Sequence, residues 1–386
     1  MIQYPPLAAR LAHIEPFHVM DVLARARAIE RRGRSIIHME IGEPDFPTAE
    51  PIVQAGMAAL RAGKTYYTPA LGLTELREAI ARSYLSPIQA NMDRVVVTPG
   101  ASGALQLIFG ALLSPGDEVL LADPGYPCSR HLVRLFEGVP VSIPVSASTS
   151  YQLTAETIRR CWTSRTVAVL VASPSNPTGT IVADEEMARI VRTVEELGGM
   201  LIVDEIYHGL TYGVELSSVL RYSDRAFAVN SFSKYYGMTG WRVGWLVAPG
   251  AYVPAMDKLA QNIFLAASTP AQHAALAALT ANARIEFERR RQVFRERRDY
   301  LLPALRQLGF DIQVEPQGAF YLYADCSRLT SDSQAFALDL LEQAGVAITP
   351  GLDFGFHRPE CHVRFSYANT LENLKEGVRR LAAYLR

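Results

Sequence analysis

Residues 231–245 read SFSKYYGMTGWRVGW and place one lysine, two serines and one arginine in a glycine-containing turn. A lysine forms an imine with an aldehyde when its ammonium group is desolvated or lies close to another cation. Serine hydroxyls and an arginine guanidinium bind phosphate. A basic surface loop is the alternative, but aromatic residues and glycines on both sides of Lys234 argue against it. We therefore expect Lys234, Ser231, Ser233 and Arg242 to bind one ligand that carries an aldehyde and a phosphate, as pyridoxal phosphate does.

The composition indicates a globular chain without a strong net charge. Its 386 residues are enough for two domains, or for one large domain with a smaller partner. The 38 basic and 39 acidic side chains nearly cancel, so nothing global attracts nucleic acid or an anionic membrane. The four cysteines lie far apart in the sequence without paired metal-ligand spacing, so we expect no metal site, no disulfide framework and a cytoplasmic location. The N-terminus lacks an apolar core of signal-peptide length, and no stretch is long enough to span a membrane.

Short apolar runs bounded by Gly, Pro or Asp predict five buried strands, at residues 95–98, 119–122, 167–172, 201–204 and 226–231. Amphipathic stretches at 104–113 and 185–197 separate some of these runs, which is typical of a mostly parallel sheet with helical crossovers. Residues 242–248 form a further apolar run after a connection too short for a helix. This strand should therefore run antiparallel to the one before it.

Polar or aromatic residues follow each of the five runs. In open α/β sheets, ligands bind outside the carboxyl ends of the strands. Turn chemistry alone explains any one of these segments, since Gly, Pro, Asn and Asp are common in turns, but it explains all five together poorly. The segments that we expect to meet at one edge of the sheet are 100–102, 123–126, 175–179, 204–207 and 231–234.

The region after residue 270 begins with a stretch, 272–306, that the pattern predicts to be helical. Its part from Arg284 to Arg306 holds eight arginines against four acidic residues, which would suit a nucleic-acid-binding helix. We favour an amphipathic connecting helix with its arginines in water and with its apolar side chains inward, namely Phe287, Phe294, Leu301 and Leu305. Residues 310–386 mix short strands, such as 319–324 and 362–365, with helices, as a second α+β domain would.

Seven ordered motifs resemble those of the class I aminotransferases of the fold type I pyridoxal-phosphate enzymes. They are IGEPDF (41–46), YTPALGLTELREAI (67–80), PGYP (124–127), SNPTG (175–179), VDEIY (203–207), SFSKYYGMTGWRVGW (231–245) and VRFSYA (363–368). The resemblance implies a mostly parallel seven-stranded sheet with helices on both faces, plus a smaller α+β domain. It also implies three parts: residues 1–45 packing with the small domain, 46–285 as the large cofactor-binding domain, and 286–386 as the small domain.

The resemblance implies a role for each residue around the cofactor. Lys234 is similar to the lysine that forms the Schiff base and then moves the proton. Asp204 is similar to the carboxylate that keeps the pyridine nitrogen protonated, and Tyr207 and Asn176 to the pair that hydrogen-bonds the ring phenolate oxygen. Tyr126 resembles the aromatic residue that stacks on the ring. The groups expected at the phosphate are Ser102, Ser231, Ser233, Arg242 and the backbone at Ala101.

The same resemblance assigns substrate contacts. Arg364 is similar to the arginine that pairs with the substrate α-carboxylate in a fork geometry that lysine cannot copy. Gly42 matches the position where a backbone N–H approaches that carboxylate, and Asn176 should assist there. Phe17 would form an apolar wall that suits neutral or aromatic side chains. This chain lacks the hydroxyl residues and the phosphate-loop lysine of some relatives, although His18 or Arg130 remains an alternative contact for a distal carboxylate.

The implied reaction moves an amino group from an L-amino acid to a 2-oxo acid. Tyr67 matches a tyrosine that reaches the phosphate of the neighbouring subunit, so a homodimer with shared active sites is expected. The nearest alternative keeps the cofactor but carries out β-elimination, as in a C–S lyase. A regulator that senses the cofactor would need a DNA-binding domain, and only about 40 residues precede IGEPDF.

Overall fold

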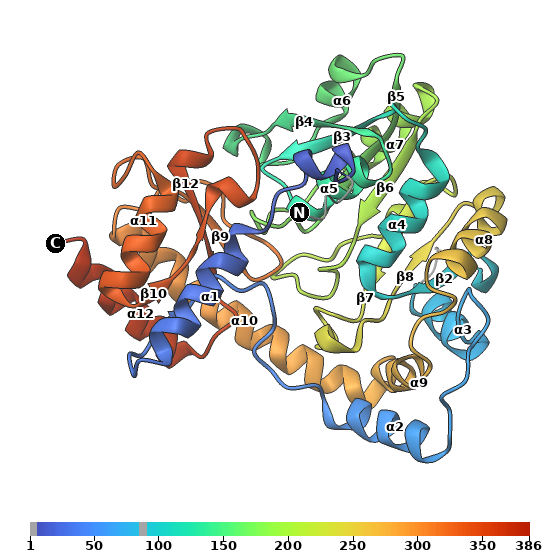
Figure 1. Ribbon diagram of the computed structural model, residues 1–386, viewed down its shortest axis with the longest axis horizontal. Helices are drawn as coiled ribbons and strands as arrows, with labels where there is room; N and C mark the ends of the chain where they lie inside the picture. Colours follow the sequence, from blue (N-terminus) through green and yellow to red (C-terminus); the bar gives the residue numbers. More distant parts are fainter. Residues whose placement is uncertain (1–5, 85–90) are drawn as a thin grey trace, which may run out of the picture.

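A seven-stranded sheet forms the centre of the computed structural model, which describes residues 6–84 and 91–386 (Figure 1). The strands, in spatial order, are β2 (Val95–Thr98), β8 (Gly244–Val247), β7 (Phe227–Ser231), β6 (Met200–Asp204), β5 (Thr166–Ala172), β3 (Glu118–Asp123) and β4 (Val139–Pro144). All neighbours are parallel except β8, which is antiparallel to both β2 and β7. The predicted strands and the antiparallel direction of the sixth are therefore confirmed. The edge strand β4 was not predicted, because its two prolines are unusual within a sheet and are tolerated at an edge.

Helices cover both faces of this sheet. Because side chains alternate along a strand, Val95 and Val97 of β2 enter one hydrophobic cluster and Val96 enters the other. The first cluster includes side chains of α2 (Glu50–Arg61), α3 (Thr74–Ser83), α6 (Ala155–Cys161), α7 (Asp184–Glu196) and α9 (Thr269–Ala278). The second includes side chains of α4 (Gly100–Leu112), α5 (Pro127–Leu135) and α8 (Val253–Ile263). The α/β fold class predicted from the sequence is confirmed.

A second lobe contains an antiparallel three-stranded sheet in the order β11-β12-β9, and it lies to the left in Figure 1. Its strands are β9 (Tyr321–Asp325), β11 (Thr349–Pro350) and β12 (His362–Ser366). The helices α11 (Ser333–Asp339) and α12 (Leu371–Tyr384) surround a separate hydrophobic cluster there. Helix α10 (Ala281–Gln307) connects the two cores, because Phe287 belongs to the cluster of the large sheet and Phe294 to that of the second lobe.

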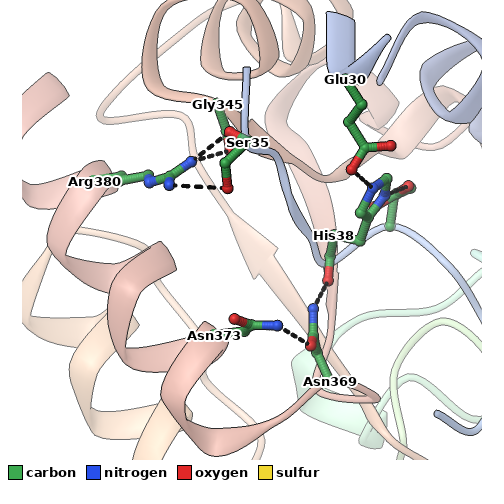
Figure 2. A network of polar contacts seen from close by, with 8 residues as sticks. Glu30, Ser35, His38, Gly345, Asn369, Asn373 and Arg380 are labelled. Carbon is green, nitrogen blue, oxygen red and sulfur yellow. Dashed lines mark hydrogen bonds and ion pairs between the residues drawn. The ribbon is translucent and has the colours of Figure 1, made fainter. Parts of the chain in front are cut away.

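The N-terminal segment is fastened to this second lobe. Strand β1 (Ile37–His38) pairs in parallel with β10 (Val346–Ala347), and α1 (His18–Glu30) lies against the C-terminal residues (Figure 1). Arg380 of α12 donates to the backbone carbonyl of Ser35, and Asn369 donates to that of His38 (Figure 2). Residues 35–38 are therefore linked to the C-terminal part of the chain by strand pairing and hydrogen bonds.

The structure of the long helix α10 confirms the predicted apolar face but not the predicted exposure of all its arginines. Phe287, Phe294, Leu301 and Leu305 are buried, as predicted. The expectation that the arginines lie in water is wrong for three of them, which are buried: Arg290, Arg297 and Arg298. None of the helices in the described part of the chain is both long and apolar enough to cross a membrane.

Distant partners lie against two of the three buried arginines of α10, and the third, Arg298, donates to the backbone carbonyl of Pro316 at 2.8 Å. Arg297 donates two hydrogen bonds to Asp45, at 2.7 and 2.9 Å, and its guanidinium lies 5.1 Å from the centroid of the Phe46 ring. Arg290 lies 5.2 Å from the same ring. A carboxylate and an aromatic face compensate the cost of burying these cations. The helix thereby holds residues 45 and 46 of the IGEPDF motif at the junction of the two lobes.

Candidate active site

A cavity of about 750 Å³ lies at the carboxyl ends of the central strands. Each of the five predicted strand ends contributes to its wall, through Ser102, Tyr126, Asn176, Asp204 and Lys234. The segments meet because their strands all run in the same direction, β2 being related to β7 through the antiparallel β8. The structure thus confirms the prediction that these segments form one edge.

Lys234 enters the cavity from the turn after β7. Its Nζ atom donates a hydrogen bond to the backbone carbonyl of Gly42 at 2.5 Å. Burial lowers the pKa of Lys234 to about 8, with the charge of Glu43 opposing the shift and those of Arg364 and Arg242 adding to it. A larger share of this amine is therefore neutral, and nucleophilic, near neutral pH than in an ordinary lysine.

Asp204 ends β6 and faces the same cavity. Its side chain is buried, and Oδ1 accepts a hydrogen bond from the backbone N–H of Ile206 at 3.0 Å. Burial raises the pKa of Asp204 to about 6, and the neighbouring Glu205 adds to this shift. A cationic group placed against Asp204 would favour its ionised form.

A cradle of groups that suit an anion lies in the wall of the cavity. Ala101 and Ser102 lie in the first turn of α4, where backbone N–H groups have no helical partner, and Arg242 and Ser233 line the wall beside them. Gly100 has a φ of +71°, and a Cβ atom there would come within 2.6 Å of the Arg242 guanidinium. The Arg242 guanidinium therefore packs directly against the backbone of Gly100, and a side chain at this position would displace it.

Ser231 lies next to this cradle, where its hydroxyl bonds the backbone of the turn after β7. Its hydroxyl donates to the backbone carbonyl of Val243 at 3.0 Å and accepts from the backbone N–H of Ser233 at 3.1 Å. Ser231 does not line the cavity, although its hydroxyl lies 2.9 Å from that of Ser233. The two serines that the sequence grouped together are therefore in contact, and Ser233 is the one that lines the cavity.

Arg364 reaches the cavity from β12 in the second lobe. Its guanidinium donates to Oδ1 of Asn176 at 2.9 Å, to Thr349 Oγ1 at 3.2 Å and to the backbone carbonyl of Glu40. Its carbon centre lies 4.3 Å from the Tyr321 ring centroid, and its Nε atom is buried without a partner among the described residues. A fixed guanidinium with an unused N–H group is suited to a carboxylate ligand.

Tyr321 is a residue of the site that the sequence did not single out. Its hydroxyl lies 2.8 Å from that of Tyr207, and both side chains line the cavity. A Cβ atom on Gly42 would overlap the Tyr321 hydroxyl, so the glycine is needed at this place. The only signal in the sequence was an aromatic strand, Phe320 to Tyr323, which predicts a core position equally well.

Apolar residues line the part of the cavity near the N-terminal segment. Phe17 packs near Tyr126 with ring centroids 6.3 Å apart and an angle of 23° between the planes. Further lining residues here were not predicted, namely Val19, Met20, Cys128, Asp353 and Phe354. Asp353 holds the first turn of α1 by accepting from the backbone N–H groups of His18 and Val19, at 2.9 and 3.2 Å.

Of the alternative contacts for a distal carboxylate, Arg130 lines a smaller pocket that shares Tyr126 and Asn176 with the cavity. Arg130 donates to the backbone carbonyl of Asp353 at 2.9 Å, and its guanidinium lies 5.3 Å from the Phe356 ring centroid. Neither Arg130 nor His18 is part of the cavity lining. Tyr67 also lies outside it, and is 82% exposed on the loop before α3.

The residues of the cavity fit pyridoxal phosphate. Three groups of the cavity match the three polar parts of that molecule. The nucleophilic amine of Lys234 suits its aldehyde, the buried carboxylate of Asp204 suits its ring nitrogen, and the cradle at Arg242 suits its phosphate. The backbone around the cradle supports this match, since a Cβ on Gly244 would lie 2.8 Å from the backbone nitrogen of Ala101. Side chains are thus kept away from the place where a phosphate would meet the start of α4.

Comparison with known proteins gives matches along nearly the whole chain. The family model described as aminotransferase class I and II matches residues 34–381. A Mycobacterium tuberculosis protein named valine–pyruvate aminotransferase is 40% identical over 97% of this chain and 97% of its own length.

Solved structures agree with these matches. A crystal structure of an aminotransferase from Mycobacterium tuberculosis superposes with a TM-score of 0.95 at 40% identity and covers 99% of both chains. An aspartate aminotransferase from Thermus thermophilus, solved with maleate, superposes with a TM-score of 0.93 at 36% identity. That match covers 98% of this chain and 100% of the other.

Proposed function

Since this chain belongs to the class I and II aminotransferases, as its seven motifs predicted, we propose that Lys234 acts on the reacting carbon and that Arg364 binds the substrate carboxylate. The chain is an aminotransferase, and its family uses pyridoxal phosphate. One observation carries the proposal: an amine with a lowered pKa and a fixed guanidinium share one cavity. Such a pair suits a substrate that has a carboxylate beside its reacting carbon.

Lys234 is proposed as the attachment point of the cofactor and as the base that moves the proton. When bound, pyridoxal phosphate supplies an aldehyde for the amino group and a ring that accepts the electron pair left on the α-carbon. Once released by the incoming amino acid, Nζ of Lys234 would be the group that takes the proton from the α-carbon and gives it up again. Its pKa of about 8 suits this exchange, because the amine both gains and loses a proton near neutral pH.

Other cavity residues would hold and tune the cofactor. Asp204 would pair with the protonated ring nitrogen, which would relieve the cost of its own burial. Tyr207 and Asn176 would hydrogen-bond the ring oxygen, and Tyr126 would stack on the ring. The phosphate would be held by Arg242, Ser102, Ser233 and the first N–H groups of α4, with Ser231 shaping the turn.

Arg364 and the backbone of Gly42 would bind the α-carboxylate, while the substrate side chain would lie toward Phe17, Met20 and Cys128. Within the described residues, the cations that line the cavity are Lys234, Arg242 and Arg364, and the proposal gives each of them another task. We therefore propose amino acids with neutral, apolar side chains as substrates. The valine–pyruvate aminotransferase at 40% identity is consistent with that class.

The proposal extends to assembly and location. Tyr67 is exposed and would reach the phosphate of a neighbouring subunit, so we propose a homodimer with shared active sites. We also propose that residues 46–285 and 286–386 act as large and small domains, with residues 1–45 packing with the small one. A cytoplasmic location would keep the cysteines reduced.

A single-turnover experiment tests the reaction. The holoenzyme mixed with L-valine and no 2-oxo acid should form at most one equivalent of 3-methyl-2-oxobutanoate per subunit and no ammonia. Adding pyruvate should then restore turnover, with alanine as the product. Continuous release of ammonia and pyruvate from O-acetyl-L-serine without an added oxo acid, together with no product from valine, would contradict the proposal and indicate β-elimination.

A further inference from the structure

An ionic cluster lies behind Arg364, outside the cavity, with Glu40 buried and with His38 and Glu30 partly exposed. Nδ1 of His38 lies 2.7 Å from Oε1 of Glu40, and Nε2 of His38 lies 3.2 Å from Oε1 of Glu30 on α1. Figure 2 shows the imidazole of His38 and its contact with Glu30. The cluster therefore joins the end of α1 to the strand that leads into the IGEPDF motif.

Glu40 connects this cluster to the cavity through its main chain. Its backbone carbonyl accepts hydrogen bonds from the Arg364 guanidinium and from Thr349 Oγ1, the second at 3.0 Å. Thr349 also accepts from Arg364 at 3.2 Å. Any movement of the Glu40 peptide would thus change the acceptors that orient Arg364.

The side chain of Glu40 depends on His38. It is completely buried, and its Oε2 atom has no hydrogen-bond partner among the described residues. Glu40 and Glu30 raise the pKa of His38 to about 9, against the opposing effect of burial. A buried carboxylate without a counter-ion is costly, so a protonated His38 is what keeps Glu40 in place.

We propose that His38 is a positioning residue for the α-carboxylate site: as an imidazolium between Glu30 and Glu40, it fixes the peptide carbonyl that orients Arg364. This inference rests on the proposed role of Arg364. A neutral imidazole has only one N–H donor, so it can serve only one of the two carboxylates. The effect is therefore present while His38 is charged and is lost as the pH rises through about 9.

The test measures binding of 3-phenylpropionate, a monocarboxylate without an amino group, to the holoenzyme by calorimetry between pH 7 and pH 10. The wild type is compared with His38→Gln, whose amide resembles a neutral imidazole, and with His357→Gln, a matched change of an exposed histidine in the same lobe. The ratio of the two dissociation constants, variant over wild type, cancels titrations that both proteins share.

For His38→Gln we expect a ratio of roughly ten at pH 7, the factor that a charge-assisted hydrogen bond typically contributes, falling toward one as the pH passes about 9. For His357→Gln the ratio should stay near one throughout. A ratio near one for His38→Gln at pH 7 would overturn the inference. Glu30→Gln provides a second route if His38→Gln does not fold. It removes one of the two carboxylates, so the pH at which the affinity for 3-phenylpropionate falls should be lower in Glu30→Gln than in the wild type. An unchanged pH of that fall would overturn the inference.

Arg364→Lys separates the two proposals. If it weakens binding of 3-phenylpropionate while His38→Gln does not, the role of His38 is wrong and that of Arg364 stands. If Arg364→Lys leaves binding unchanged, the carboxylate site itself has been misassigned and the role of His38 falls with it.

Discussion

The guanidinium of Arg364 on β12 donates to Oδ1 of Asn176, which follows β5, at 2.9 Å. A residue of the second lobe and a residue of the large sheet are thereby joined in the wall of one cavity. The proposed carboxylate site and cofactor site therefore share Asn176. A substitution of this residue should affect the binding of both the substrate and the cofactor.

Asn176→Asp should weaken substrate binding more than cofactor binding. An aspartate would pair with Arg364 and compete with the substrate carboxylate, which we expect to lower kcat/KM by roughly ten- to a hundredfold. Steady-state kinetics with L-valine, together with a cofactor titration, would measure both effects. An unchanged kcat/KM would show that the Asn176–Arg364 contact has no part in carboxylate binding.

Arg364→Lys and Phe17→Ser should affect different ends of the substrate. Arg364→Lys keeps the charge but loses the fork, so kcat/KM should fall for every amino donor, by about 2 kcal/mol or more of transition-state stabilisation. Phe17→Ser should instead reorder the preference among apolar donors and leave the common chemistry intact. A panel of donors measured on both variants checks this, and the opposite pattern would show that the two ends are assigned the wrong way round.

Asp204→Asn should stabilise the protein without cofactor while it reduces turnover. The pKa of Asp204 is raised from 3.8 to about 6, so folding favours its protonated form. The stability that this group contributes is complete below about 3.8 and is lost as the pH rises through about 6. At pH 8 the ionised carboxylate then costs about 3 kcal/mol, and the asparagine variant avoids this cost while its Oδ1 still accepts from Ile206.

Denaturant unfolding of the apoprotein at pH 8 and pH 4 measures this effect. The variant should be more stable at pH 8, and its advantage should shrink at pH 4. Equal stability of the two proteins at pH 8 would show that burial of the ionised Asp204 carboxylate does not destabilise the protein.

Mixed dimers should recover activity. If Tyr67 serves the neighbouring subunit, a dimer of a Tyr67→Phe chain and a Lys234→Ala chain contains one site with both native groups. Mixing the two variants under conditions that exchange subunits should therefore give more activity than either alone. A fully active monomer at nanomolar concentration would rule out shared sites.

The centre of the site is predictable from the sequence because its signals are local. Each of the five strand ends lies directly beside an apolar run, so the pattern of apolar and polar residues alone places Lys234 and Asp204 at one edge of the sheet. Tyr207 and Asn176 needed the family resemblance, since alone they suggest core packing and a turn. Arg364 needed it as well, because strand β12 belongs to the other lobe.

Contacts between distant segments could not be predicted. Asp353 reads as an ordinary loop residue, yet it caps α1 more than 330 residues earlier in the chain. Arg297 of α10 was expected in water because its partners, Asp45 and Phe46, are about 250 residues away. Pairing of this kind depends on the tertiary fold and leaves no periodic pattern in the sequence.

The most direct test of the account is the identity of the lysine that carries the cofactor. The chain has only four lysines, Lys64, Lys234, Lys258 and Lys375, so the assignment by peptide mapping is unambiguous. The holoenzyme is reduced with borohydride, digested and mapped by mass spectrometry. We predict that the pyridoxyl mass is found on the peptide that contains Lys234 and is absent from the Lys234→Ala variant. The same mass on Lys64, Lys258 or Lys375 of the wild type would contradict the account.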